Sequence, residues 1–264
     1  MAANIKYTYS KEQKTTNNSP IISVITICFN AQSSIEKTIQ SVIVQNCTQF
    51  EYLIIDGNSH DDTKKIIQKY INKIDFFSSQ PDRGIYDAMN SGIQNAKGKW
   101  LIFLNAGDTF SEPTLLQYII NKYIKCTTAD FLYSDVYLID ALNRKSIYKC
   151  NHERTIINHQ CSIYKKSLHE HYGMYLVAKK VTISDYLFFS LIPISSFKKI
   201  DKIIANYDTT GISQGVNTIR QKFTIDFLLG KIGIFSFVLR IFLYNYYAKL
   251  KKLWISTLNK LIFK

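Results

Sequence analysis

The sequence predicts an α/β fold built around a mostly parallel sheet. Apolar runs with the length of strands alternate with segments of helical periodicity through the first 108 residues. A polar cluster follows each apolar run, as expected of loops at the carboxyl edge of a parallel sheet. The runs that we expect to form strands are 21–30, 51–57, 74–79 and 99–108.

The first strand and helix have the clearest patterns. The run 21–30 is apolar and β-branched until it ends at Asn30, which is typical of a strand buried on both faces. In 33–45, Ile35, Ile39 and Val42 recur at helical spacing behind a serine cap. Because the strand 51–57 follows at a short distance, we expect a right-handed βαβ unit.

The alternation continues along the chain. A helix is predicted to begin near Asp61 and Asp62, since acidic side chains favour a helix N-terminus. The weaker strand 74–79 precedes a helix, and the strand 99–108 closes the series. The remaining predicted elements are helices over 85–96 and 112–125 and a hairpin made by 131–140 and 146–150 around Asn143.

Positive charge is concentrated near the C-terminal end. The 264 residues carry a formal charge of +13, and 215–264 alone contain nine Lys and Arg against one acid. We expect a polar N-terminal extension (1–20), a folded domain (21–213) and basic, hydrophobic C-terminal helices (214–264). The five cysteines lack zinc-site spacing, and the N-terminal residues lack a signal-peptide core, so we expect reduced thiols in a cytoplasmic protein.

Several segments occur in an order and spacing that resemble a known enzyme family. They are SVITICFN (23–30), YLIIDGNSHDDT (52–63), PDRGIYDAMNSGIQNAKGKWLIFLNAGD (81–108), HQCSIY (159–164), ISDYLFF (183–189) and ANYDTTGIS (205–213). Together they resemble family 2 glycosyltransferases, in particular bacterial O-antigen and polysaccharide enzymes. The resemblance implies a Rossmann-like GT-A fold and inverting transfer of a sugar from a nucleotide diphosphate sugar.

The resemblance also implies a donor site. It assigns nucleotide-sugar binding to five residues: Phe29, Asn30, Asp56, Arg83 and Asp108. Asp56 is similar to the family's nucleoside-binding carboxylate, although Asp at this position also suits a turn cap. Arg83 offers a planar fork to phosphate oxygens, and its alternative role is a salt bridge with Asp82 or Asp87.

The tetrapeptide NAGD (105–108) stands where the family has its acidic, DxD-like metal motif. Asn105 and Gly107 occupy positions where acids are common, so only Asp108 is retained. One carboxylate is acceptable for Mg²⁺, which keeps waters and uses substrate phosphates, and Mn²⁺ suits the same ligands. We therefore expect Mn²⁺ or Mg²⁺ at Asp108, whereas Gly107 alternatively opens space for the diphosphate.

Inversion in one displacement requires a base that takes the proton of the acceptor hydroxyl. Asp185 matches the residue to which the family assigns this role, and its alternative role is a helix N-cap, which Ser184 also fits. His159 and Gln160 resemble the family's acceptor-binding pair. A single histidine is often structural, and that alternative stays open for His159.

The C-terminal segment combines apolar and basic residues. Arg240, near the middle of the apolar stretch 232–248, argues against a membrane span. We expect helices that lie on an anionic membrane surface, and helices that pack on a domain or a second copy are the alternative. The predicted polar stripe is Asn245, Lys249, Lys252, Ser256, Asn259 and Lys260, opposite Leu250, Leu253, Trp254, Leu258 and Leu261.

The expected activity is transfer of a hexose to a polyprenyl-diphosphate-linked saccharide at the cytoplasmic face of the cell membrane. UDP-glucose, giving a β linkage, is the first expected donor and UDP-galactose the second. One alternative is a catalytically silent, nucleotide-binding scaffold, suggested by the missing acids in NAGD. The other is a nucleic-acid-binding protein, suggested by a pI of about 9.4 but disfavoured because the bases lie in a hydrophobic tail.

Overall fold

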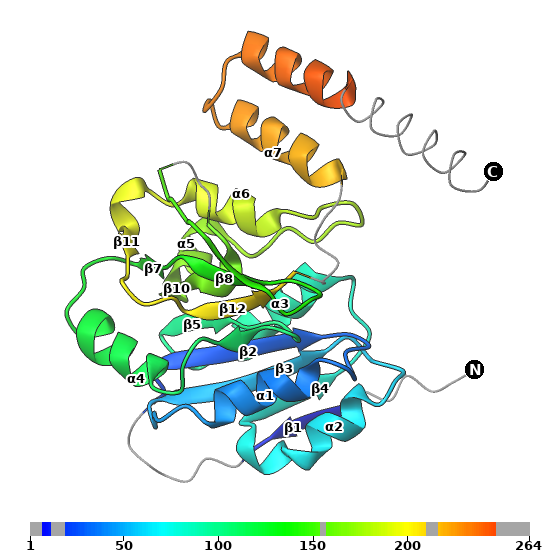
Figure 1. Cartoon of the computed structure of the whole chain (residues 1–264), viewed down its shortest axis with the longest axis vertical. Helices are drawn as coiled ribbons and strands as arrows, with labels where there is room; N and C mark the ends of the chain where they lie inside the picture. The colour runs from blue at the N-terminus through cyan, green and yellow to red at the C-terminus, as the bar shows by residue number, and fades with distance from the viewer. Residues whose placement is uncertain (1–6, 12–18, 154–156, 210–215, 247–264) are drawn as a thin grey trace. The chain divides into compact units, whose positions relative to one another are not determined.

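The chain forms two compact units, Met1–Lys179 with Ser184–Gly211 and Lys180–Ile183 with Ile212–Lys264. The structure, a computed structural model, describes residues 7–11, 19–153, 157–209 and 216–246 (Figure 1). All described strands belong to the first unit, and the described residues 216–246 of the second are mainly helical.

Four parallel strands form the centre of the first unit. All seven residues of β2 are buried, which explains why apolar residues occupy both of its faces instead of alternating with exposed polar ones. β2 lies between β3 and β5, and β4 pairs with the other edge of β3. These strands, at the positions predicted, are β2 (Ile22–Cys28), β3 (Phe50–Asp56), β4 (Phe76–Ser79) and β5 (Trp100–Phe103).

Antiparallel pairs extend this centre into a mixed sheet of eight strands in the order β1-β4-β3-β2-β5-β10-β7-β11. β1 pairs antiparallel with β4 at one edge, and β10 pairs antiparallel with both β5 and β7. β11 then runs parallel to β7. The added strands are β1 (Tyr7–Ser10), β7 (Phe131–Tyr133), β10 (Ser162–Lys165) and β11 (Phe197–Lys199).

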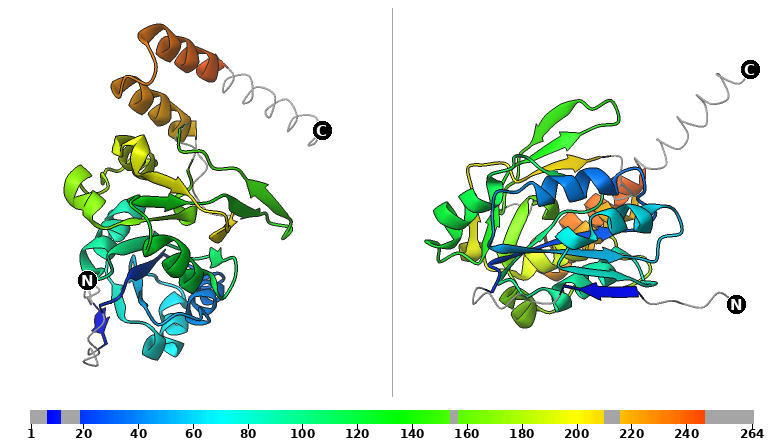
Figure 2. Two further views of the ribbon diagram at one scale, coloured as in Figure 1. Left: turned by 90° about the vertical axis from the view of Figure 1, so that its left-hand side faces the viewer. Right: turned by 90° about the horizontal axis from the view of Figure 1, so that it is seen from below.

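Helices cover both faces of this sheet, so the predicted α/β fold is confirmed. α1 (Ile35–Ile43) and α2 (Thr63–Lys69) lie on one face and α3 (Ile85–Asn95) on the other (Figures 1 and 2). This change of face follows from the strand order, because the chain steps one way from β2 to β4 and then returns to β5. The reversal of direction between β2 and β5 is where ligands bind in open α/β sheets.

A second sheet has four strands in the order β6-β12-β8-β9. The predicted hairpin forms from β8 and β9 and turns at Asn143, whose φ is 57°. Its expected first residues, Phe131–Tyr133, instead form β7 in the large sheet, because all three are buried between β10 and β11. The strands are β6 (Thr109–Phe110), β8 (Val136–Ile139), β9 (Lys145–Tyr148) and β12 (Ala205–Asp208).

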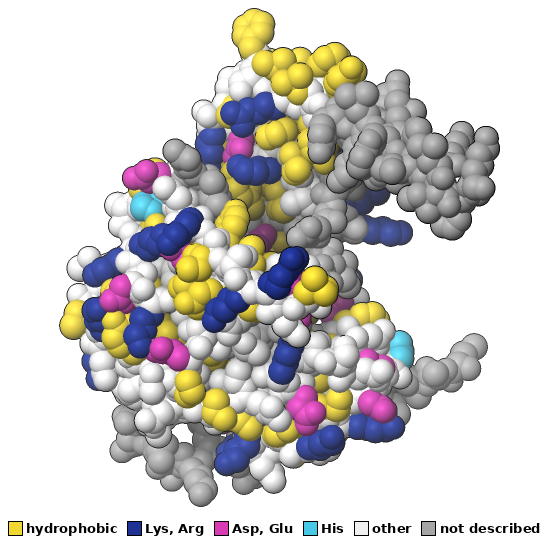
Figure 3. Space-filling model, in the orientation of Figure 1, with side chains coloured by type: hydrophobic (Ala, Val, Ile, Leu, Met, Phe, Trp, Pro, Cys, Tyr) yellow, Lys and Arg dark blue, Asp and Glu magenta, His cyan; other side chains and the backbone are white. Residues whose placement is uncertain are grey.

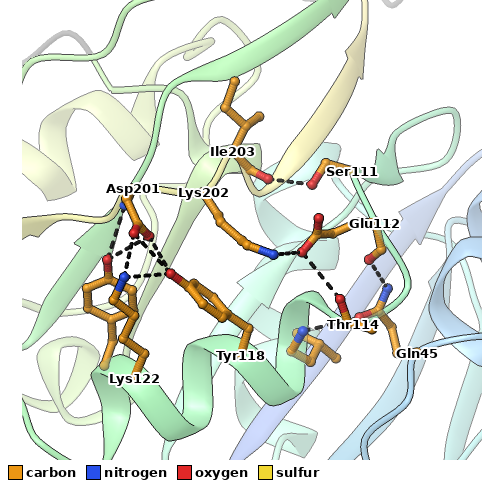
Figure 4. A network of polar contacts seen from close by, with 11 residues as sticks. Gln45, Ser111, Glu112, Thr114, Tyr118, Lys122, Asp201, Lys202 and Ile203 are labelled. Atoms are coloured by element: carbon orange, nitrogen blue, oxygen red, sulfur yellow. Dashed lines mark hydrogen bonds and ion pairs between the residues drawn. The ribbon is translucent and has the colours of Figure 1, made fainter.

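A polar network holds the segment before β12 against α4 (Leu115–Ile119) and the π-helical turn Ile120–Ile124 (Figure 4). Asp201 accepts hydrogen bonds from Tyr118 Oη at 2.9 Å, Tyr123 Oη at 2.8 Å and Lys122 Nζ at 2.5 Å. Lys202 forms an ion pair with Glu112. The network therefore fixes the entry of β12, the strand that ends at Asp208.

Two further helices complete the described part of the first unit: α5 (Ser167–Tyr172) and α6 (Ser184–Leu191). α6 begins with two polar residues before an apolar stretch. The hydroxyl of Ser184 accepts a hydrogen bond from the Leu176 backbone N–H at 2.6 Å. This contact ties the start of α6 to the loop that follows α5 and fixes the position of Asp185.

The second unit contains α7 (Val216–Leu228) and a helical stretch over 234–246. The rings of Phe227 and Phe237 stack with their centroids 4.8 Å apart and join the two helices. Within the described ranges, we find no helix long and apolar enough to cross a membrane. Of the predicted polar stripe, only Asn245 lies within the described residues.

Candidate active site

The loops after β2 and β3 meet at the carboxyl edge of the large sheet. Asn30 has a left-handed backbone (φ 48°), and its side-chain oxygen accepts a hydrogen bond from the His60 backbone N–H at 2.9 Å. The Asn30 backbone N–H donates to Ser59 Oγ at 2.8 Å. Phe29 remains 57% exposed beside the His60 ring, so this edge presents an aromatic surface to solvent.

Asp56 lies at the end of β3 and is fully buried. Its carboxylate accepts hydrogen bonds from Ser59 Oγ and Ser79 Oγ, each at 2.5 Å, and from the Ser59 backbone N–H at 3.0 Å. Burial and the adjacent Asp56 carboxylate raise the pKa of the Cys28 thiol well above its usual value. In this arrangement, Asp56 holds Ser59 and thereby organises the 57–59 loop at the carboxyl edge of the sheet.

Arg83 follows β4 and forms the ion pair with Asp87 that the sequence allowed. Its guanidinium donates to Asp87 Oδ1 at 2.8 Å, and 75% of the Arg83 side chain is exposed. Burial raises the pKa of the neighbouring Asp82, and the charges of Asp87 and Asp56 add to this effect. A cavity of about 290 Å³ lies here, and its lining includes Asp82, Arg83, Asp87, Asn90, Ser91 and Gln94.

The NAGD loop is fastened to α1 through one hydroxyl group. Thr38 Oγ1 donates to the Asp108 carbonyl at 2.7 Å and accepts from the Gly107 N–H at 2.9 Å. Gly107 has a φ of 105°, which explains the glycine at this position. The Asp108 carboxylate is almost completely buried and accepts from the Asp208 backbone N–H at 2.9 Å.

Asp108 therefore has an unusual titration. Burial raises its pKa to about 7, although the Asp208 N–H, the His159 charge and the Gln160 side chain each favour the carboxylate. Asp208 lies beside Gly107, since a Cβ added there would be 3.5 Å from its carboxylate oxygen. Lys37 on α1 forms an ion pair with Asp208 at 2.7 Å.

Asp185, in the first turn of α6, forms a connected group with His159 and Tyr86. His159 Nδ1 lies 3.0 Å from Asp185 Oδ2, and Tyr86 Oη donates to Asp185 Oδ1 at 2.7 Å. The Asp185 side chain is 18% exposed, so a small part of it faces solvent. Burial alone would raise the pKa of Asp185, but His159 and then Tyr86 outweigh burial and hold the pKa below its usual value.

The predicted acceptor pair lies between Asp108 and Asp185. Asn105 Nδ2 is 3.0 Å from His159 Nε2, so the NAGD loop contacts His159 directly. The Gln160 side chain hydrogen-bonds Asp108, and its carbonyl oxygen is buried with no hydrogen-bond partner among the described residues. The structure thus brings Asn105, Asp108, His159, Gln160 and Asp185 together, whereas Asp56 and Arg83 belong to the adjoining loops.

Sequence reasoning did not select Tyr86, Lys37 or Asp208. Tyr86 and Asp208 both lie inside segments that resemble the family, at 81–108 and 205–213, but no local pattern distinguishes them from structural polar residues. Their partners are distant: Tyr86 and Asp185 are 99 residues apart, and Lys37 and Asp208 are 171 apart. Only the fold identifies these pairs.

The oxygen atoms around Asp108 fit a hard divalent cation. A buried carboxylate whose pKa is raised by burial becomes easier to ionise when a cation binds it. The unpartnered carbonyl oxygen of Gln160 offers a neutral oxygen close by. Within the described residues, no three His, Cys, Asp or Glu side chains form a complete metal site, so phosphates and water would have to supply the remaining ligands.

Comparisons with known proteins identify the family and the fold. Residues 23–181 match Glycosyl transferase family 2. An uncharacterized glycosyltransferase of Mycobacterium tuberculosis is 28% identical over 203 residues, which cover 74% of this chain and 78% of the relative.

Two solved structures show the same fold. Staphylococcus aureus TarS 1–349 in complex with UDP-GlcNAc has a TM-score of 0.63 at 17% identity, covering 79% of this chain and 65% of that chain. The mannosyltransferase PcManGT of Pyrobaculum calidifontis, in complex with GDP-Man and Mn²⁺, has a TM-score of 0.61 at 13% identity, covering 81% and 65%. The chain thus spans slightly less than two thirds of each solved chain. Because the family match covers more than half of the chain, the protein belongs to Glycosyl transferase family 2 and is a glycosyltransferase with a GT-A-like fold.

Proposed function

We propose that this glycosyltransferase is an inverting enzyme in which Asp185 is the general base. The observation that carries the proposal is the position of the Asp185 carboxylate, held by Tyr86 and His159 but still partly exposed. Two fixed donors orient the carboxylate, and each of its oxygens has a second lone pair for an acceptor hydroxyl. The low pKa keeps Asp185 ionised at neutral pH, as a base requires.

The proposed donor is a UDP-hexose, with UDP-glucose first, UDP-galactose second and a β linkage in the product. Phe29 and Asn30 with the loop organised by Asp56 would contact the nucleoside. Arg83 would reach the diphosphate by leaving Asp87, which its exposure allows. TarS, which shares the fold, was solved with a UDP-sugar, and this supports the choice of nucleotide.

Asp108 would hold Mg²⁺ or Mn²⁺ together with the donor diphosphate. When bound, the cation neutralises negative charge that develops on the diphosphate as the sugar leaves. Gln160 fixes the Asp108 side chain, and His159 with Gln160 would orient the acceptor beside Asp185.

The proposed acceptor is a polyprenyl-diphosphate-linked saccharide in O-antigen or surface polysaccharide synthesis, met at the cytoplasmic face of the membrane. Support comes from the helical stretch 234–246, where exposed apolar side chains recur every three or four residues. Basic side chains accompany them on the C-terminal helices (Figure 3). The exposed residues are Phe235, Val238, Leu239, Phe242, Leu243 and Tyr246, and the bases are Arg220, Lys222, Lys231 and Arg240.

The decisive experiment is a donor panel with the purified protein, Mg²⁺ or Mn²⁺, and each common UDP-, GDP- and dTDP-sugar. Nucleotide release is followed with and without a synthetic lipid-diphosphate sugar. We expect nucleotide release from one UDP-hexose, and this release should depend on the acceptor. Asp185→Asn should abolish the release but still bind UDP. The exposed control Asp62→Asn should release nucleotide as the wild-type protein does. Silence across the panel with UDP still bound would support the catalytically silent scaffold.

A further inference from the structure

A second carboxylate lies beside the NAGD loop. β6 follows Asp108 directly and pairs antiparallel with β12, in a register that sets Thr109 opposite Asn206. Continued by two residues, this register sets Asp208 opposite Gly107, and the side chains of opposite residues occupy the same face of a sheet. A Cβ at Gly107 would lie 3.5 Å from an Asp208 carboxylate oxygen. The Asp208 carboxylate therefore lies against the place where a side chain at 107 would begin.

The backbone of β12 keeps this carboxylate next to Asp108. The Asp208 backbone N–H donates to Asp108 Oδ1 at 2.9 Å. Burial first, and then the negative charge of Asp208, raise the pKa of Asp108, so the two carboxylates act on each other. A cation in contact with both would relieve their repulsion, and the pair therefore favours the binding of positive charge.

Lys37 already supplies one positive charge at this place. Its Nζ pairs with Asp208 Oδ2 at 2.7 Å, and 49% of the Lys37 side chain is exposed against 22% of the Asp208 side chain. Ion pairs of exposed lysines are weak, so another cation can replace the ammonium at little cost. Because one ammonium balances only one of the two carboxylates, a divalent cation matches the charge of the pair better than Lys37 does.

A buried oxygen beside Asp108 indicates which kind of cation fits. Gln160 is 2% exposed, and its side chain hydrogen-bonds Asp108. The Gln160 carbonyl oxygen has no hydrogen-bond partner among the described residues, and a buried oxygen left in this state is unfavourable. Carboxylate and amide oxygens are ligands of hard divalent cations such as Mg²⁺ and Mn²⁺. Asp108, Asp208 and Gln160 together offer three such side chains.

We infer that Asp208 is a second protein carboxylate of the cation site, in place of an acid at 107, and that Lys37 occupies this carboxylate until the cation binds. The glycine at 107 leaves the room that the Asp208 carboxylate needs. The inference rests on the cation proposed at Asp108 and adds to it a ligand that is 100 residues away in sequence. The donor diphosphate and water would complete the set of ligands.

The first test counts the water molecules on Mn²⁺ bound to the full-length protein with UDP, by electron–nuclear double resonance at saturating Mn²⁺. Water replaces a carboxylate that is removed from the metal, so Asp208→Asn should show about one water more than the wild-type protein. The matched control is Asp130→Asn. It breaks another ion pair of 2.7 Å, with Lys165 at the amino end of β5, and should leave the water count unchanged.

The second test detects the ligand in the wild-type protein itself. With ¹³C in the aspartate carboxyl groups, the wild-type protein should show couplings from two carboxylates to the bound Mn²⁺, and Asp208→Asn should show one. A single carboxylate on Mn²⁺ in the wild-type protein, or an unchanged water count in Asp208→Asn, would overturn the inference even if Mn²⁺ affinity falls. Asp208 would then act only through its charge.

Two further outcomes separate this inference from the proposed function. If the wild-type protein with UDP binds no Mn²⁺, both the inference and the cation proposed at Asp108 are wrong. If two carboxylates bind Mn²⁺ in a protein that turns over no donor, the inference is supported and the proposed catalytic function fails.

Discussion

Lys37 Nζ lies 2.7 Å from Asp208 Oδ2, so α1 is joined to the end of β12 beside the NAGD loop. Lys37→Met should change the free energy of unfolding by less than about 1 kcal/mol, because the lysine is half exposed. The same change removes a positive charge near the proposed metal site and should tighten Mn²⁺ binding about tenfold in the presence of UDP. Titration calorimetry measures this affinity.

Asp208→Asn provides the matched variant and should weaken Mn²⁺ binding, since it removes negative charge from the same place. Opposite effects of the two substitutions are the expected result. If Lys37→Met instead weakens UDP binding and leaves Mn²⁺ affinity unchanged, Lys37 contacts the diphosphate and does not compete with the cation.

Asp108→Asn should stabilise the protein in a manner that depends on pH. The folded-state pKa of about 7 lies above the ordinary value of an aspartate, about 4, so wild-type stability falls as pH rises from about 4 to 7. The variant has no carboxyl group there, and its advantage should grow by about 2–3 kcal/mol between pH 5 and pH 8. Urea denaturation at both pH values, without divalent metal, measures the difference. A constant advantage would show that Asp108 does not titrate in this range.

Tyr86→Phe should alter the pH profile of transfer. The Tyr86 hydroxyl stabilises the ionised form of Asp185, so its removal raises the pKa of that carboxyl. The acidic limb of kcat against pH should move upward by up to about one unit, and kcat should fall several-fold because the base is less well oriented. An unchanged limb would mean that Asp185 is not the group whose ionisation governs the rate.

Phe235→Ser with Phe242→Ser should reduce binding to phosphatidylglycerol vesicles about tenfold or more, since each buried aromatic side chain contributes about 1.5–3 kcal/mol. Phe235 is 90% exposed, and Leu142→Ser with Ile147→Ser changes two exposed apolar residues on the other unit as a control. Vesicle sedimentation at low and high salt measures the binding. If a dimer disappears and vesicle binding does not change, the apolar stripe joins two copies of the chain.

Gly98→Ala should destabilise the first unit by about 2 kcal/mol or more. A Cβ at Gly98 would lie 2.5 Å from the Ser23 backbone nitrogen, and backbone of a central strand cannot move aside. Gly233→Ala is the control, because among the described residues no atom beyond the adjoining chain lies within 4 Å of a Cβ there. Thermal unfolding of both variants measures the effect, and equal melting temperatures would contradict the close packing at Gly98.

The large sheet could be predicted because strands that are buried on both faces are rich in apolar residues, and this composition is visible in the sequence. Ile22–Cys28 is buried on both faces, and accordingly all of its residues are apolar except Ser23 and Thr26, whose hydroxyls form buried hydrogen bonds. The polar clusters after these runs predicted the loops at the carboxyl edge of the sheet. They also predicted that Asn30, Asp56 and Asp108 lie at that edge. The place of Phe131–Tyr133 could not be predicted, since an apolar three-residue run suits either a hairpin or a central strand.

The contacts among the site residues could not be predicted from the sequence. Asn105 was interpreted as a missing metal ligand, whereas its amide contacts His159. That contact depends on the 3-10 turn at His159–Cys161, which leads directly into β10 beside β5. A side chain 54 residues away in sequence leaves no local signal at Asn105.

The short strand β1 also determines how the chain can be shortened. Tyr7–Ser10 covers the outer edge of β4 through antiparallel pairing, and the Tyr7 ring lies 5.6 Å from that of Phe77. A form that begins at residue 19 would leave the backbone N–H and C=O groups of β4 unpaired along that edge. Open strand edges recruit other strands, so this shortened enzyme would be prone to aggregate even though no residue of the candidate active site had been removed.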